Sequence, residues 1–159
     1  MFMKSIQSLC LIQSILMKTD LSNATFIIPI RIESDDRLRN VVTSIAFLVE
    51  NFDTNIIVKE VDKESVFQTE VLPIFEEILE VDLWKNFHHI FERSEEPLFH
   101  RQRVLNEMIA ECETDIVVNY DCDVILPMKS YELAYNGITE GIYDVVYPYG
   151  SGMYQKQVA

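Results

Sequence analysis

The chain has 159 residues, of which 48% are hydrophobic and 11% aromatic, so it is long and apolar enough to form one globular domain with a full core. Its four glycines and five prolines exclude a low-complexity chain. Twenty-six acidic residues against 13 basic ones give a formal net charge of −13, which opposes binding to nucleic acid and to anionic membranes. Nucleic acid is therefore not an expected partner, while peripheral association with a membrane is left open.

Residues 1–20 are expected to form an N-terminal extension or a surface helix. The stretch from Ser5 to Met17 is fairly apolar, but it is too short and too polar to span a membrane. It also lacks the basic start and small-residue cleavage site of a signal peptide. Two interpretations stay open, an amphipathic helix or a natural translation start at Met17. Residues 21–159 are expected to form one domain.

The hydrophobic patterns of this domain alternate between the periods of strands and of helices. Ser34 is a good helix N-cap, and the two acids after it favour a first helical turn. Pro29 is unusual in a buried strand, so we expect it at a strand exit. In chain order the sequence predicts a strand (25–31), a helix (34–51), a strand (55–61), a helix (72–79), a short strand (88–92), a helix (99–111), a strand that begins near 115 and carries Asp121 and Asp123 at its far end, a helix (130–138) and a last strand (143–148).

This alternation predicts an α/β domain with a mostly parallel sheet flanked by helices. Such sheets bind their ligands at the carboxyl ends of their strands. The residues predicted at such ends are Arg31, Glu60, Asp62, Asp121 and Asp123.

Asp121 and Asp123 follow the apolar run of the fourth predicted strand. In a strand, residues two apart point to the same face, so the two carboxylates are expected on one face and Cys122 on the other. Two hard oxygen ligands on one rigid edge suit a divalent cation that carries phosphates. The alternative is an ordinary polar strand end.

The six arginines lie in two short stretches of this acidic chain, which favours an anion-binding pocket. Arg101 and Arg103 fall in the first turn of their predicted helix, where a cation opposes the helix dipole. A phosphate bound there would reverse the sign of that effect. The alternative is that both face water or pair with Glu95 and Glu96. The full set of arginines is Arg31, Arg37, Arg39, Arg93, Arg101 and Arg103.

The cysteines and histidines suggest neither a disulfide framework nor a metal centre. Three cysteines, an odd number without paired spacing, indicate reduced thiols and a cytoplasmic setting. His88 and His89 are adjacent in a predicted strand and face opposite ways, so they cannot easily chelate one ion. We expect structural or surface roles for these two residues and for His100.

Three blocks of the sequence form one ordered pattern. They are Pro29-Ile30-Arg31, Phe99-His100-Arg101 and Asp121-Cys122-Asp123 with Pro127-Met128 after it. In this order they resemble GT-A-fold glycosyltransferases, and they are similar to β1,4-galactosyltransferases and to chondroitin-polymerase-like bacterial family 2 enzymes. In that family Pro-Phe-Arg follows the first strand, Phe-Asn-Arg opens a helix, and Asp-Val-Asp ends a strand before Pro-Met. The resemblance covers residues 24 to about 150.

The resemblance implies a transfer of sugar from a nucleotide-sugar, with a UDP-sugar as the expected donor, to a saccharide acceptor. It implies that Asp123, with Asp121, holds Mn²⁺ or Mg²⁺, and that the ion stabilises the diphosphate leaving group. Ile30 replaces the family's aromatic residue and His100 its asparagine, which leaves the donor's identity open. The implied nucleotide-binding residues are Pro29, Ile30, Arg31, Glu60, Arg101, Asp121 and Cys122.

The enzymes of this resemblance have a second half that binds the acceptor and supplies the catalytic base. We therefore expect residues 21–159 to be the donor-binding half of a truncated GT-A domain, with the base beyond Ala159 and with inversion at the sugar. One alternative is a non-catalytic module that binds nucleotide and metal. Another is an aspartyl phosphatase of the haloacid-dehalogenase type, whose Asp-x-Asp motif Asp121-Cys122-Asp123 matches. A nucleotidyltransferase would need a Gly-rich loop, which residues 32–36 do not offer.

Overall fold

The computed structural model describes residues 18–79 and 85–148. The chain divides into two compact units, the first ending at Val124 and the second starting at Ile125. Most of the expected N-terminal extension, residues 1–17, lies outside the described residues, as do residues 149–159. Thr19 and Asp20, the last residues of that expected extension, belong to the first strand of the sheet.

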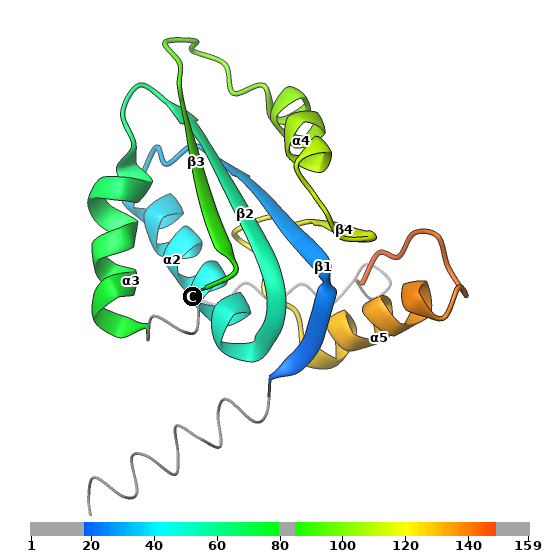
Figure 1. The fold of residues 1–159 in the computed structure, drawn as a ribbon. Coiled ribbons are helices and arrows are strands. Elements are labelled where there is room, and N and C mark those ends of the chain that lie inside the picture. Colours follow the sequence, from blue (N-terminus) through cyan, green and yellow to red (C-terminus); the bar gives the residue numbers. More distant parts are fainter. Residues whose placement is uncertain (1–17, 80–84, 149–159) are drawn as a thin grey trace, which may run out of the picture. The chain divides into compact units, whose positions relative to one another are not determined.

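The first unit is an α/β unit with a four-stranded sheet (Figure 1). All of its strand pairs are parallel, and the strand order is β3-β2-β1-β4. This Rossmann-like arrangement confirms the predicted fold class. Its elements are β1 (Thr19–Ile30), α2 (Asp35–Asn51), β2 (Phe52–Asp62), the π-helical turn η1 (Phe67–Val71), α3 (Leu72–Ile78), β3 (Phe87–Arg93), α4 (Arg101–Ala110) and β4 (Ile116–Asn119).

Helix α2 begins where the sequence predicts it. The Ser34 side chain accepts a hydrogen bond from the backbone N–H of Arg37 at 3.3 Å, which satisfies one of the donors that a helix start leaves unpaired. Asp35 and Asp36 occupy the first turn, where negative charge complements the helix dipole. The start of α2 is therefore fixed by local sequence alone.

Pro29 lies at the exit of β1, as predicted, one residue before the strand's last. Its Cα partner across the ladder to β2 is Lys59. The carbonyl of Ile27 accepts a bond from Tyr120 N on the β4 side, so Pro29, two residues later, faces the same side. β4 has ended at Asn119 by then, so the missing N–H of proline leaves no ladder bond unmade.

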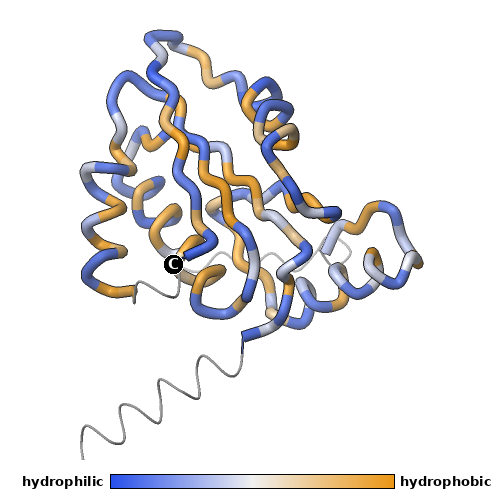
Figure 2. The backbone as a smooth tube through the Cα atoms, viewed as in Figure 1, coloured by the Kyte–Doolittle hydropathy of each residue, from blue (hydrophilic) through white to orange (hydrophobic). Residues whose placement is uncertain are grey.

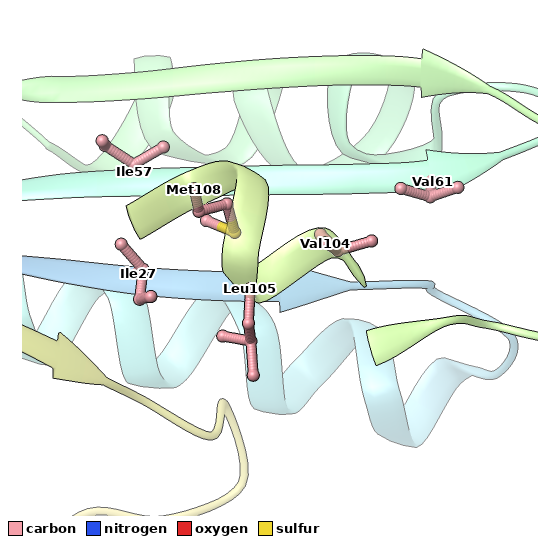
Figure 3. Packing of buried hydrophobic residues seen from close by; sticks show 6 residues of the cluster. All are labelled: Ile27, Ile57, Val61, Val104, Leu105 and Met108. Atoms are coloured by element: carbon pink, nitrogen blue, oxygen red, sulfur yellow. The ribbon is translucent and has the colours of Figure 1, made fainter. Parts of the chain in front are cut away.

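The sheet is covered on both faces. In Figure 2 the strands β1 and β2 carry long hydrophobic stretches, as expected for parallel strands that are buried on both sides. Helix α4 packs on one face, and α2 and α3 lie behind the other (Figure 3). The buried cluster under α4 is formed by Ile27, Ile57, Val61, Val104, Leu105 and Met108.

The alternation of strand side chains decides which face each charged residue joins. Lys59 lies on the same face as Ile57 and Val61, under α4. Glu60, the next residue of β2, therefore points to the opposite face. Lys59 and Glu60 are neighbours in β2, but their side chains lie on opposite faces of the sheet and have different partners.

The second unit contains α5 (Met128–Thr139). The strand predicted over 143–148 is wrong, because these residues have no regular secondary structure. After α5, Gly141 adopts a positive φ of 68°, and the backbone N–H of Tyr143 returns to the carbonyl of Gly137 at 3.0 Å. A Cβ on Gly137 would lie 2.8 Å from the Tyr143 ring. The chain thus folds back over α5 at the point where the predicted strand would have begun.

Candidate site at the carboxyl edge of the sheet

The two aspartates singled out by sequence lie in a turn and not in a strand, so the predicted extension of the strand to Asp123 is wrong. β4 stops at Asn119, because its pairing with β1 ends there. The Tyr120 hydroxyl donates to the Val124 carbonyl at 2.6 Å, and Val124 N donates to the Asp121 carbonyl at 3.2 Å, which closes a turn.

The expected alternation of exposure nevertheless appears in this turn. Asp121 and Asp123 are exposed, whereas Cys122 is buried. Burial raises the pKa of the Cys122 thiol, so sulfur stays protonated near neutral pH and is not a thiolate ligand. The turn therefore presents two carboxylates to solvent at the carboxyl edge of the sheet.

Arg101, the first residue of α4, reaches this turn. Its Nη2 lies 2.5 Å from Asp121 Oδ1 and 3.1 Å from Asn119 Oδ1. The side chains of Arg101 and Asp121 are 41% and 55% exposed. The sequence predicted Arg101 and Asp121 as parts of one site, and the fold brings them into contact. Asn119 was missed, because its role depends on where β4 ends.

Arg37 approaches the same turn from α2. Its Nη1 lies 3.9 Å from Cys122 Sγ, a weak contact with a neutral partner. Sequence analysis counted Arg37 among the clustered arginines but did not place it in the nucleotide site. A signal was present, since Arg37 also falls in the first turn of a helix, where a cation opposes the dipole.

Arg31, predicted to line the nucleotide, is buried and bonded to the protein. Its Nε donates to the Val61 carbonyl at 2.9 Å, and its Nη1 donates to the Pro97 carbonyl at 3.2 Å. The guanidinium also lies over the Phe99 ring, 5.6 Å from its centroid. Arg31 thus ties the ends of β1 and β2 to the segment just before α4, and it helps to set where Arg101 begins that helix.

Arg103 belongs to an ion network on the α4 face of the sheet and does not pair with Glu95 or Glu96. It contacts Glu92 and Glu107, each at 2.7 Å. Lys59 joins the same two carboxylates at 3.1 and 2.6 Å. Hydrogen bonds from Arg103 and Lys59 lower the pKa of Glu92. Two cations and two anions therefore balance each other and hold α4 against β2 and β3.

Glu60 is not brought to the edge with the other predicted residues. Its side chain is fully buried on the face opposite α4, where it accepts from Ser65 Oγ at 2.5 Å and from Phe67 N at 3.0 Å. His89 Nε2 lies 3.4 Å away and its ring stacks on Phe67. Burial opposes ionisation of Glu60, but the hydrogen bonds from these groups outweigh it, so the pKa of Glu60 is below its ordinary value.

The remaining predicted residues lie at the ends of β1 and β2. Ile30 is buried in the core, and Pro29 is half-buried. Asp62, the last residue of β2, accepts a hydrogen bond from Lys63 N at 2.8 Å. Of the predicted nucleotide and metal residues, the fold therefore assembles Arg101, Asp121 and Cys122 with Asp123 at one turn.

This turn offers two oxygen ligands for a cation. Within residues 18–79 and 85–148, three or more His, Cys, Asp or Glu side chains are nowhere gathered as a metal-binding group. Two carboxylates with open coordination positions fit an ion that takes its other ligands from phosphate and water, as Mg²⁺ does in many phosphate-binding sites. They do not fit an ion that is caged by protein alone.

Comparisons with known proteins add no family to this description. The chain matches no protein-family model, and no curated protein matches its sequence significantly. In the part of the chain that the structure describes, none of the helices combines the length and the apolar character needed to cross a membrane.

Proposed function

We propose that this protein binds the nucleotide-sugar donor, with a UDP-sugar as the expected molecule, in a metal-dependent glycosyltransferase. The observation that carries the proposal is the contact of Arg101 with Asp121, beside Asp123, at the carboxyl edge of a parallel sheet. Ligands of open α/β sheets bind at this edge. The order of the three sequence blocks that resemble GT-A glycosyltransferases supports the same assignment.

In this proposal Asp121 and Asp123 hold Mn²⁺ or Mg²⁺, and Arg101 and Arg37 attract the diphosphate. The bound ion would act as a Lewis acid that stabilises the departing nucleoside diphosphate. Guanidinium groups suit phosphate because they donate in a planar, paired geometry. Arg31 has a supporting role, since its donors already serve the carbonyls of Val61 and Pro97.

The acceptor saccharide and the catalytic base are assigned to no residue of this chain. The enzymes that it resembles supply the base from a following half, and they invert the sugar. The proposal for the described residues is therefore limited to binding of the donor and the metal ion. A cytoplasmic setting is part of the proposal, supported by Cys112 and Cys122, which are free thiols.

Calorimetry with a panel of nucleoside diphosphates, with and without Mn²⁺, tests the proposal. We expect UDP to bind in the presence of Mn²⁺, and Asp123→Ala to weaken this binding at least about tenfold, because a direct ligand of the ion is lost. Asp53→Ala is the matched control, since Asp53 is an exposed aspartate at the start of β2, at the other edge of the sheet. Absence of binding by every diphosphate, with and without metal, would falsify the proposal.

The phosphatase alternative requires one aspartate of the turn to attack phosphorus. Asp121 Oδ1 is held by the Arg101 guanidinium, and a carboxylate in such a pair is a weaker nucleophile. Trapping with fluoroberyllate, detected as an Asp121 adduct by mass spectrometry, would favour the phosphatase over the glycosyltransferase.

A further inference from the structure

The turn after β4 already holds a cation of the protein's own. One carboxylate oxygen of Asp121, Oδ1, is in contact with Arg101 Nη2 at 2.5 Å. A divalent ion bound to this carboxylate and the guanidinium would repel each other strongly. A metal ion that binds Asp121 is therefore expected to loosen or displace Arg101.

A displaced Arg101 would have no comparable anion on its own helix. It is the first residue of α4, at the positive end of the helix dipole, and the first turn of α4 contains no acidic residue. Arg103, two residues along, is itself balanced by Glu92 and Glu107. The most favourable new partner of a guanidinium in this position is an external anion such as phosphate.

We propose that Arg101 is an exchangeable counter-ion, which leaves Asp121 when a divalent cation binds and then pairs with the phosphates of the bound nucleotide. This inference rests on the proposed function and adds a rule to it: cation and nucleoside diphosphate bind cooperatively. Binding of either ligand alone carries the full free-energy cost of breaking the ion pair of Arg101 with Asp121. When both ligands bind, this cost arises only once. By linkage, each then raises the affinity of the other by the same factor.

The charges around the turn agree with this exchange. Arg37 and Arg101 together cancel Asp121 and Asp123, so the site is formally neutral without ligands. A divalent cation leaves two excess positive charges, which the two negative charges of the diphosphate in a nucleotide-sugar neutralise. Neither of these ligands alone leaves the site balanced, whereas the two together do.

Electron paramagnetic resonance of Mn²⁺ tests the exchange, because it reports free Mn²⁺ directly and needs no catalytic activity. The proteins are the full chain, its Arg101→Gln variant and an Arg39→Gln control, which removes the same charge from an arginine that pairs only with exposed Asp36 among the described residues. We expect Arg101→Gln to bind Mn²⁺ alone about two- to fivefold more tightly than the unmodified chain, as follows from removing an exposed competing ion pair. With saturating UDP, Arg101→Gln and the unmodified chain should bind Mn²⁺ with equal affinity. The factor by which UDP raises the Mn²⁺ affinity is then smaller in Arg101→Gln by the same ratio.

Two outcomes overturn the exchange. One is an unchanged Mn²⁺ affinity in Arg101→Gln. The other is an affinity that rises equally with and without UDP, which would make Arg101 a simple repelling charge. If Arg101→Gln does not fold, as judged by circular dichroism, Arg101→Lys replaces it. Equal coupling in Arg101→Lys and in the unmodified chain would also count against the exchange, since an ammonium lacks the planar, paired donors with which a guanidinium binds phosphate.

Failure of the proposed function gives a different result. In that case the unmodified chain binds no nucleoside diphosphate under any condition. The arm with Mn²⁺ alone still decides whether Arg101 competes with a cation for Asp121.

Discussion

Glu60 and the turn of Asp121 and Asp123 make an instructive pair. Both were predicted as acidic positions at carboxyl ends of strands. Glu60 is inside the ladder, opposite Ile30 of β1 and Phe91 of β3, and its side chain is fully buried among protein donors. The aspartates lie beyond the ladder, in a turn, and are exposed.

The difference shows that proximity to a strand end does not by itself place a side chain in a site. A residue still within the ladder is assigned to one face by the alternation of the strand, and that face is covered by a helix in this fold. A residue after the last ladder bond is not assigned to a face by this alternation. Glu60 therefore stabilises the fold, while the aspartates are available to a ligand.

The largest effect expected from this contrast is on stability. Glu60→Ala should lower the free energy of unfolding by roughly 3 kcal/mol, because Ser65 Oγ and Phe67 N are left as buried donors without their acceptor. Asp123→Asn should change it by less than about 0.5 kcal/mol, since the side chain is exposed. Urea denaturation of both variants measures the free energy of unfolding. Equal losses in the two variants would show that Glu60 and Asp123 do not differ in their contribution to stability.

The pH dependence of stability should show the same asymmetry. The pKa of Glu60 is lowered in the folded state, so its contribution is fully present above its ordinary value of about 4.5 and is lost as the pH falls through the folded-state value. The unfolding free energy should decrease from pH 5 downwards less steeply in Glu60→Gln than in the unmodified chain. Parallel curves for the two proteins would show that the bonds to Glu60 do not depend on its charge.

The helix that carries Arg37 offers a smaller test. Ser34→Ala removes the cap of α2 and should cost about 1 kcal/mol of stability. Because Arg37 lies in the turn that this cap fixes, Mn²⁺-dependent binding of UDP should also weaken, but by less than in Asp123→Ala. A binding loss as large as that of Asp123→Ala would mean that the first turn of α2 is a direct part of the site.

The smallest effect is expected in the network that holds α4. Arg103→Gln should lower stability by about 0.5–1 kcal/mol, since the Arg103 side chain is 43% exposed and water weakens its pairs. Arg93→Gln is the control, because within residues 18–79 and 85–148 Arg93 makes a single exposed pair, with Glu95 at 3.6 Å. Thermal unfolding measures the loss of stability in both variants. Equal losses would show that the ion network of Arg103 stabilises the fold no more than a single exposed ion pair does.

Sequence reasoning succeeded where the cause was local. Ser34 and the two acids after it define the start of α2 within four residues. It failed where the cause lay in contacts with another segment of the chain. The end of β4 depends on its short pairing with β1, and the fate of residues 143–148 depends on the return of the chain over Gly137.

The arginines show which properties the sequence predicts and which only the tertiary structure decides. By itself the sequence determined the α/β class, the order of the elements as far as α5, and a set of arginines and carboxylates near the edge of a parallel sheet, because periodicity and capping act over a few residues. Only the tertiary structure decided which of these charges are already neutralised. Arg31 is bound to a carbonyl 66 positions away, and Arg101 to a carboxylate 20 positions away. Such contacts are set by strand order and side-chain face, and these arise only when the sheet assembles.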